Sequence, residues 1–226
     1  MTILCIETST SVCSAAICKD GAPIKQCICL EGSNHARLLP RYIDELLSFA
    51  REQGCTIEAV ALSEGPGSYT GLRIGASTAK GLCYGLNVPL IPVPTLDVLC
   101  EAAKSKIENR ESKIVLIPMI DARRMEVYTM IDGETKAVVV ENEQSLYTGN
   151  EDVYYFGDGA AKCAKIFTKP NWHYIPDIVP EAKYVGALAE NRKSKIDNRA
   201  SVDIAYYEPF YLKEFIAAQS HVKGLK

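Results

Sequence analysis

The sequence predicts an α/β fold in which helices cover a sheet, and three observations support this prediction. Apolar and β-branched runs at residues 3–6 and 12–18 indicate strands separated by a short polar turn. Apolar residues recur every three or four positions between residues 38 and 50, as on one face of a helix. A short strand at residues 59–62 leads through a glycine turn into a second helix. Strands alternating with helices are typical of an α/β layer rather than an all-β barrel.

The first hundred residues divide into elements in chain order. Three strands form a predicted antiparallel meander, because Asp20 and Gly21 are a turn signal. These strands span residues 3–6, 12–18 and 24–30, and they are followed by a helix from about residue 38 to 54, a strand at 59–62, a helix at 69–86, a strand at 89–93 and a helix at 95–103. Ser33 or Asn34 is the candidate cap of the first helix. Pro40 should kink that helix unless the helix begins at Leu39.

The second half repeats this order in outline. Strands are predicted at residues 114–120, 125–131, 137–140, 153–156 and 175–179, and helical stretches at 160–167 and 184–192. Residues 104–112 are charged and predict a surface connection. Strands, a glycine turn and a helix follow one another in both halves, which indicates a duplicated α/β unit. We therefore predict a first domain at residues 1–103 and a smaller second domain at residues 104–226, with the last helix able to pack back on the first domain.

Composition narrows the classes of function. The chain has 226 residues, 47% hydrophobic and 23% charged, with a net charge of -3 and a pI of about 5.7. Lys and Arg are scattered apart from a C-terminal group (Lys213, Lys223, Lys226) interpreted as a solvated tail, so unaided nucleic-acid binding is not expected. No apolar run approaches the ~18 residues of a membrane span, and no basic region precedes an apolar one at the N-terminus. We expect a cytoplasmic protein without a membrane partner.

The cysteines and histidines give no catalytic or metal site. The nine cysteines include no Cys-x-x-Cys pair, and we interpret them as free thiols in a reducing compartment; a zinc site or a nucleophilic cysteine is the alternative. A helical metal pair at His35 would need a second histidine four residues on, where Leu39 stands. His173 and His221 are isolated, and no sequence context ties a serine to any of the three histidines. We predict no catalytic residues and no metal ligands.

The stretch SEGPGSYTGLRIGASTAKGLCYG, at residues 63–85, joins a strand to a helix through a glycine turn. It is not a P-loop, because Gly71 is followed by Leu72, and it is not Gly-x-Gly-x-x-Gly, because three residues separate Gly67 from Gly71. Free N–H groups and hydroxyls at the start of a helix nevertheless favour an anion. The candidate anion-binding residues of this turn are Gly65, Gly67, Ser68 and Thr70.

Arg73 and the helix glycines raise the question of a partner. A cation in the first turn opposes the helix dipole, so Arg73 is expected to meet a carboxylate, a phosphate or an acidic residue of another chain. Gly71 and Gly75 are four residues apart, as are Gly81 and Gly85, and each glycine costs about 1 kcal/mol of helix propensity relative to alanine. Two explanations stay open: close packing within the chain's own core, or close approach of a partner helix or subunit. Thr78 extends the small-residue face.

Residues 7–11, Glu-Thr-Ser-Thr-Ser, lie between two predicted strands. In proteins that hold phosphate with a β-hairpin, this place carries an acid and hydroxyl residues. Glu7, Thr8 and Ser9 are therefore candidates for anion or nucleotide binding, and a plain polar turn is the alternative.

Three stretches carry a resemblance to a known family: ILCIETSTSVCSAAI, SNHARLLPRYIDELL and, above all, GPGSYTGLRIGASTAKGL. IDARRMEVY and EPFYLK agree as well. Together they resemble the TsaB family, also described as YeaZ-type or glycoprotease-like. The resemblance is strong over the first ~100 residues and patchy to about Lys213.

The resemblance implies the fold of actin, Hsp70 and sugar kinases, with two βββαβα-type domains. It also implies a role in making threonylcarbamoyladenosine in tRNA as a non-catalytic subunit. In such systems the paralogue TsaD transfers the threonylcarbamoyl group and uses a His-x-x-x-His metal site, TsaE joins the pair, and TsaC or a relative makes the adenylate. The chain would pair with TsaD through its N-terminal helices, form a homodimer when alone, and reach tRNA through the complex. It would hold no cofactor of its own, with ATP, ADP and metal entering only in the complex with TsaD and TsaE.

The expected partner-binding residues lie on the two N-terminal helices. They are His35, Leu38, Leu39, Tyr42, Ile43, Leu46, Gly71, Arg73, Gly75, Thr78 and Leu82. A Gly75→Trp change is expected to break pairing and leave the monomer folded. Glu7 departs from the family, which commonly has Asp there, and this disfavours a nucleotide in the chain's own cleft. The alternative function is a stand-alone enzyme of the actin-like fold, either an ATP-using phosphotransferase or a metallopeptidase-like protein.

Overall fold

The computed structural model describes residues 1–32, 34–107, 113–192 and 202–213. Its first unit is a five-stranded sheet with the order β3-β2-β1-β4-β5. The strands are β1 (Thr2–Glu7), β2 (Cys13–Lys19), β3 (Ala22–Cys29), β4 (Ala59–Gly65) and β5 (Leu90–Pro94). β1, β2 and β3 form the predicted antiparallel meander, whereas β4 and β5 continue the sheet in parallel with β1. The predicted α/β class is confirmed.

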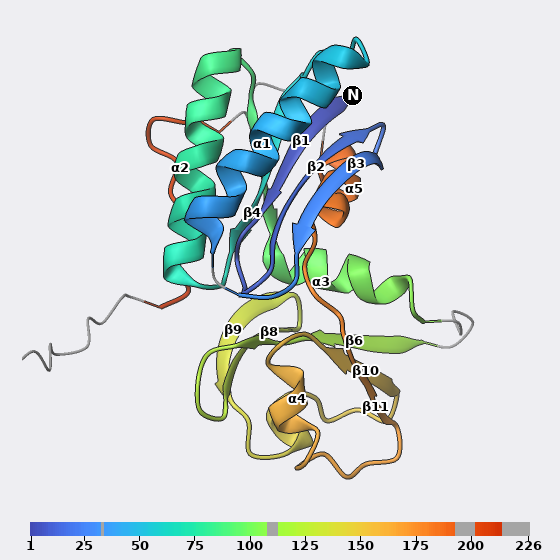
Figure 1. Cartoon of the computed structure of the whole chain (residues 1–226). Helices are drawn as coiled ribbons and strands as arrows, with labels where there is room; N and C mark the ends of the chain where they lie inside the picture. Colours follow the sequence, from blue (N-terminus) through green and yellow to red (C-terminus); the bar gives the residue numbers. More distant parts are fainter. Residues whose placement is uncertain (33, 108–112, 193–201, 214–226) are drawn as a thin grey trace, which may run out of the picture.

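Helices cover both faces of this sheet (Figure 1). α1 (His35–Glu52) and α2 (Tyr69–Leu86) pack on one face, and α3 (Thr95–Lys104) and α5 (Ala182–Asn191) pack on the other. Because side chains alternate along a strand, β1 sends Leu4 and Ile6 toward α1 and α2, and Ile3 and Cys5 toward α3 and α5. A strand buried on both faces is apolar without interruption, which explains the run of apolar residues at positions 3–6 of β1.

The bounds of α2 and the start of α3 agree with the prediction, and of the two starts left open for α1 the structure has the one that follows Asn34. α1 already begins at His35, and Pro40 lies inside it with its ring exposed. Pro40 has no N–H to donate to the carbonyl of Ala36 and its ring crowds that carbonyl, yet the helix continues through this position. Asn34 occupies the cap position without a capping side-chain hydrogen bond, and Ser33 lies outside the described residues.

The second unit is smaller and consists of two three-stranded sheets, β11-β10-β6 and β7-β8-β9. Its elements are β6 (Ile114–Pro118), β7 (Ile120–Asp121), β8 (Glu126–Ile131), β9 (Glu134–Val139), the 3-10 turn η1 (Glu143–Ser145), β10 (Asp152–Phe156), α4 (Ala160–Cys163) and β11 (Trp172–Ile175). The strand predicted at 114–120 is split at Met119, because its first part pairs with β10 and its last part with β8. Between β9 and β10, where the first unit has α1, the described chain forms only η1.

Two further predictions in this unit are corrected. The helix after Gly159 ends at Cys163 rather than residue 167, because Phe167 turns in to pack against Tyr155 and Trp172, with ring centroids 4.9 and 4.8 Å away. β11 spans 172–175 rather than 175–179, since it pairs with β10 along this length and Pro176 follows it. Residues 108–112 of the connection expected at 104–112 lie outside the described residues, as do His221, Lys223 and Lys226.

After the second unit the chain returns to the first. α5 packs on β1 and β2, and residues 202–213 run along α2 with Tyr207 buried in its core. Lys80 Nζ donates to the carbonyls of Ala205 and Tyr207, at 3.2 and 3.1 Å, and the Phe210 amide donates to the Glu64 carbonyl at 2.8 Å. None of the helices in the described ranges combines the length and the apolar character that a membrane span requires.

Candidate functional site

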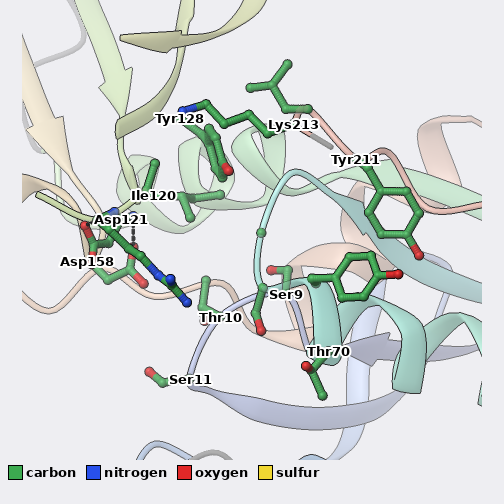
Figure 2. Close-up of a pocket in the computed structure, with 16 residues that line it drawn as sticks. Ser9, Thr10, Ser11, Thr70, Ile120, Asp121, Tyr128, Asp158, Tyr211 and Lys213 are labelled. Carbon is green, nitrogen blue, oxygen red and sulfur yellow. Dashed lines mark hydrogen bonds between the residues drawn. The ribbon is translucent and has the colours of Figure 1, made fainter. Parts of the chain in front are cut away.

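A cavity of about 480 Å³ lies between the two units. Its first wall is the loop after β1 (Ser9, Thr10, Ser11) together with the turn before α2. The opposite wall comes from β7, from the residues that follow it and from Asp158 after β10. Tyr211 and Lys213 of the C-terminal segment close one side (Figure 2). The cavity therefore depends on three parts of the chain that are far apart in sequence.

The glycine turn of the first wall packs tightly against the loop after β1. The Ser68 amide donates to the Ser9 carbonyl at 2.7 Å, and a Cβ added at Gly67 would overlap with the same carbonyl. The Ser68 hydroxyl accepts from the Gly71 amide at 3.4 Å and so caps α2. Gly67 is thus required by the close approach of two backbone segments.

The second unit makes the same contact with its own glycine turn. The Gly159 amide donates to the Met119 carbonyl at 3.1 Å, and a Cβ added at Gly157 would overlap with that carbonyl. In the first unit, β4 is parallel to β1, and the turn after β4 packs on the end of β1. In the second unit, β10 is parallel to β6, and the turn after β10 packs on the end of β6. This correspondence agrees with the duplicated unit inferred from the sequence.

The second wall carries the charges of the cavity. Asp121 and Asp158 lie next to each other, with the Asp121 amide donating to Asp158 Oδ1 at 2.9 Å (Figure 2). Burial raises the pKa of Asp158, and the Asp121 and Gly159 amides oppose this rise. Lys162 forms an ion pair with Asp121, and Lys213 forms one with Glu126. The lining thus carries two carboxylates, Asp121 and Asp158, and two cations, Arg123 and Lys213, so its formal charges balance.

The predicted anion-binding residues separate into two groups. Ser9, Gly67, Ser68 and Thr70 line the cavity, whereas Glu7, Thr8 and Gly65 do not. Gly65, with φ at 118°, faces the carbonyl of Phe210 instead. The hydroxyl of Thr8 donates to the Gly71 carbonyl at 2.8 Å inside the core.

Glu7 is fully buried behind Ser9. Its Oε1 accepts from the amide and the hydroxyl of Ser9, at 2.6 and 2.5 Å, and its Oε2 has no hydrogen-bond partner within the described residues. Burial raises the pKa of Glu7, and nearby hydroxyls and amides of Ser63, Ser9 and Thr8 lower it by less. The expectation that Glu7 faces a bound anion is corrected: its carboxylate positions the loop that faces the cavity.

The helix glycines resolve into two pairs. A Cβ at Gly71 would overlap with the Thr8 carbonyl, and a Cβ at Gly75 would overlap with the Thr8 hydroxyl. These two glycines serve close packing within the chain, so placing them on a partner surface is corrected. Gly81 and Gly85 are exposed, and a Cβ at either would meet no atom within 4 Å.

The other predicted pairing residues differ in exposure. Leu39, Ile43 and Leu46 are buried in the core under α1. His35 is also buried, with Nε2 2.9 Å from the Thr10 carbonyl, so it holds the cavity loop instead of presenting itself to a partner. Four side chains remain half-buried: Leu38, Tyr42, Thr78 and Leu82.

Arg73 is exposed, and its guanidinium donates to the Tyr69 hydroxyl at 2.7 Å. The Tyr69 ring packs on Tyr211 of the C-terminal segment, with centroids 5.2 Å apart. No carboxylate among the described residues forms an ion pair with Arg73. The predicted acidic or phosphate partner of Arg73 is therefore not supplied by the described part of the chain.

Sequence reasoning missed the second wall. Asp121, Arg123, Asp158, Tyr211 and Lys213 line the cavity, but none was predicted as a site residue. The signals were available in the stretches IDARR, GDG and EPFYLK, which carry polar residues next to strand ends or turns. Among the residues whose positions are described, no three His, Cys, Asp or Glu side chains are grouped in a way that could hold a metal ion.

Comparison with known proteins finds a family and individual proteins to which this chain is similar. The profile of the family "TsaD: tRNA N6-adenosine threonylcarbamoyltransferase" matches residues 30–219. A TsaB protein of Haemophilus influenzae, named for tRNA threonylcarbamoyladenosine biosynthesis, is 29% identical over 94% of this chain and 94% of its own length. TsaB of Escherichia coli is 36% identical over 57% of this chain, a match that spans about half (53%) of that relative.

Two solved structures share the fold. YeaZ from Pseudomonas aeruginosa is 26% identical, with a TM-score of 0.72 over 93% of this chain and 99% of that protein. A second structure, described as similar to peptidase YEAZ, is also from Pseudomonas aeruginosa and has a TM-score of 0.72 at 24% identity over 94% of this chain and 99% of that one. The whole described arrangement of two units is therefore shared with solved proteins.

Proposed function

The chain belongs to the TsaD family of tRNA N6-adenosine threonylcarbamoyltransferases, and from this premise we propose that it acts in threonylcarbamoyladenosine synthesis as a non-catalytic subunit. The resemblance to the TsaB, or YeaZ-type, family is confirmed by the relatives and structures of those names. In this proposal the chain binds and activates a TsaD-type transferase, TsaE joins the pair, and TsaC or a relative supplies the adenylate. ATP, ADP and metal enter only with these partners, tRNA is reached through them, and the complex works in the cytoplasm.

The outward face of α2 is the observation that supports pairing. Arg73 is the one charged residue among its exposed positions; positions 70, 77, 81, 84, 85 and 86 are uncharged, and so are the half-buried Thr78 and Leu82. Gly81 and Gly85 leave open space, although each costs about 1 kcal/mol relative to alanine and nothing in the described chain fills that space. The small residues at positions 77, 81 and 85 allow another helix to pack at short interaxial distance, and Tyr84, which is 84% exposed, offers an apolar contact beside them. Arg73, beside this face, is available to a carboxylate of the partner.

Because Gly75 is buried and Gly81 is exposed, a substitution at Gly81 is the better test of pairing. A tryptophan at Gly75 would collide with Thr8 and Leu62 of the same chain, so the Gly75→Trp variant would report on folding as well as pairing. Gly81→Arg places a large charged side chain on the open face instead. Val139→Arg, at a 61% exposed position of the second unit, is the matched control.

The experiment is light scattering on a sizing column. The chain is run alone, with the TsaD-type transferase of the same organism, and with that transferase plus ATP. We expect a homodimer alone and a heterodimer that replaces it when the transferase is added. Gly81→Arg should lose the heterodimer and Val139→Arg should keep it, with unfolding transitions of both variants near that of the parent.

A different pattern would contradict the proposal. If the parent chain ignores the transferase, the subunit role is wrong, and if Gly81→Arg pairs normally, the α2 face is not the interface. Turnover of ATP by the pure chain would favour the stand-alone enzyme instead. Because Asp158 lies in the cavity and Glu7 does not, loss of that turnover in Asp158→Asn is the sharper check of such an enzyme.

A further inference from the structure

The nine cysteines are all free thiols, and two pairs lie close together on adjacent strands. Cys5 and Cys18 are fully buried beneath α5, where both sulfurs crowd the Gly186 backbone. An oxidant in solution cannot reach this pair without the release of α5. Cys13 and Cys29 form the second pair, on β2 and β3. Cys13 is buried but Cys29 is half-exposed, so this pair can be reached from one side.

The sheet places Cys13 and Cys29 directly opposite each other. They are partners in the antiparallel register of β2 and β3, followed by Ala15 and Cys27. Cys13 and Cys27 both belong to the core under α1, and Cys29 lies two residues from Cys27 on the same face of β3. Directly opposed residues in an antiparallel pair have Cα atoms about 4.5–5.5 Å apart, within the range of about 4.4–6.8 Å that a disulfide requires.

The backbone around the pair allows the small approach that bond formation needs. β3 is an edge strand of the first sheet, with β2 as its neighbour on one side. Cys29 is the last residue of β3, and its Sγ lies 3.0 Å from the Glu31 carbonyl. The end of an edge strand can move with the loss of few hydrogen bonds.

We propose that Cys13 and Cys29 form a reversible intramolecular disulfide when the chain meets a hydroperoxide. The half-exposed Cys29 reacts first: its thiol loses a proton, the thiolate sulfur attacks one oxygen of hydrogen peroxide, and the O–O bond breaks. The departing hydroxide takes up a proton and leaves as water, and Cys29 becomes a sulfenic acid. The Cys13 sulfur then attacks the Cys29 sulfur, the S–O bond breaks, and the departing hydroxide takes the Cys13 proton and leaves as water. The two thiols lose two electrons in total, and the peroxide accepts them.

The order of these steps follows from the surroundings of Cys13. Burial, together with the nearby Cys29 and Glu7, raises the pKa of the Cys13 thiol to about 11, so little thiolate is present there for direct attack on peroxide. Its position opposite Cys29 compensates, because the second step is intramolecular.

The consequence of the bond concerns α1 and the cavity loop. Cys13 begins β2 directly after the loop that lines the cavity, and Tyr42 of α1 packs close enough to Cys13, Cys27 and Cys29 for these groups to raise the pKa of its hydroxyl, next to the larger effect of burial. A disulfide at this place fixes the end of β3 to the cavity loop under α1. A thiol reductant reverses it.

The test uses the full chain, reduced, freed of reductant and exposed to increasing hydrogen peroxide. Remaining thiols are alkylated, and unreduced peptides are mapped by mass spectrometry. We expect a crosslinked peptide pair that contains Cys13 and Cys29, with the monomer mass lowered by two hydrogen atoms and restored by dithiothreitol. The link should be absent from Cys29→Ser and Cys13→Ala and present in Cys27→Ser, which changes a neighbouring thiol on the same face.

Cys13→Ala changes a core residue and could fail to fold. In that case Cys29→Ser, at a half-exposed position, still tests whether the link needs this pair of cysteines. A Cys13–Cys27 link in the parent would overturn the assignment of the pair. So would links only between two chains, or oxidation of Cys29 to the sulfinic acid without any link to Cys13. The proposal would also be refuted if the parent chain and Cys29→Ser lost equal numbers of thiols to intramolecular disulfides.

Discussion

An added Cβ would overlap with Thr8 at Gly75 but would meet no atom within 4 Å at Gly81, although both glycines lie in the same helix. Gly75→Ala forces Thr8 to move, and this hydroxyl already donates to the Gly71 carbonyl. We expect Gly75→Ala to lower the free energy of unfolding by about 1–3 kcal/mol, as overpacked cores do. Gly81→Ala adds helix propensity without contact and should raise it by up to about 1 kcal/mol. Urea unfolding of the two variants checks the signs, and equal effects would contradict the division of the glycines.

The buried carboxylate of Glu7 gives a prediction about pH. Burial raises its pKa above the ~4.3 of an unfolded chain, so the folded state holds the proton more tightly. Its contribution to the free energy of unfolding therefore falls as pH rises above about 4 and through the folded pKa. Glu7→Gln removes this titration, and its stability relative to the parent should increase from pH 4 to pH 7 in urea unfolding.

Glu151 is the control of opposite sign. The Tyr147 hydroxyl, the backbone and Lys113 lower its pKa to about 2, so its stabilising contribution is present above the unfolded pKa of ~4.3 and is lost as pH falls toward 2. Glu151→Gln should therefore lose stability relative to its parent over the same rise from pH 4 to 7, most of it near pH 4. Parallel pH profiles for the two variants would show that Glu7 is not held in an unfavourable charged state.

At the scale of elements, the C-terminal segment behaves as part of the first unit. Tyr207 is buried in the core beside α2, yet its hydroxyl has no hydrogen-bond partner within the described residues. Tyr207→Phe removes an unpaired buried group and should be neutral or slightly stabilising. Tyr207→Ala should lose about 3–5 kcal/mol, as large aromatic truncations do. Thermal or urea unfolding separates the two; a Phe variant as unstable as the Ala variant would mean that the hydroxyl is needed.

The elements also show what the sequence could and could not determine. Both ends of α2 were predictable, because Ser68 is a good cap and Asn87, at φ 55°, ends the helix locally. The start of α1 was left open between two positions, because Asn34 is a suitable cap whereas Pro40 disfavours a helix interior, and the structure has the start after Asn34. The break at Met119 depends on which neighbours β6 and β7 pair with, and no local pattern encodes that choice.

The candidate site was predictable only for the wall whose residues belong to local sequence motifs. Ser68 and Thr70 follow from the glycine turn, and Ser9 from the polar loop after β1. Asp121 and Asp158 face them only because the two units meet, which is tertiary information. For the same reason the sequence could not tell which glycines of α2 face Thr8 and which face open space.

At the scale of the whole molecule, the chain crosses between its units and returns. The second face of the first sheet is covered by α3 and by α5, whose Ala182, Val185 and Ala189 are buried against residues of β1, β2, β4 and β5. A boundary at residue 103 therefore removes α5 from the second face of a sheet whose first strand is buried on both faces. A core open on one side rarely outweighs the conformational entropy of folding, because the buried area supplies the main favourable term.

We accordingly expect residues 1–103 alone to lack a cooperative unfolding transition. The same fragment joined through a flexible Gly/Ser linker to residues 180–213 should regain one, because α5 and Tyr207 return to the two faces of the sheet. Amide chemical-shift dispersion and urea unfolding measure both fragments. A matched control carries Gly186→Val in the joined fragment: its side chain would collide with Cys18 and displace α5. If residues 1–103 unfold cooperatively without the added segment, the first unit is an independent domain and α5 is dispensable for its core.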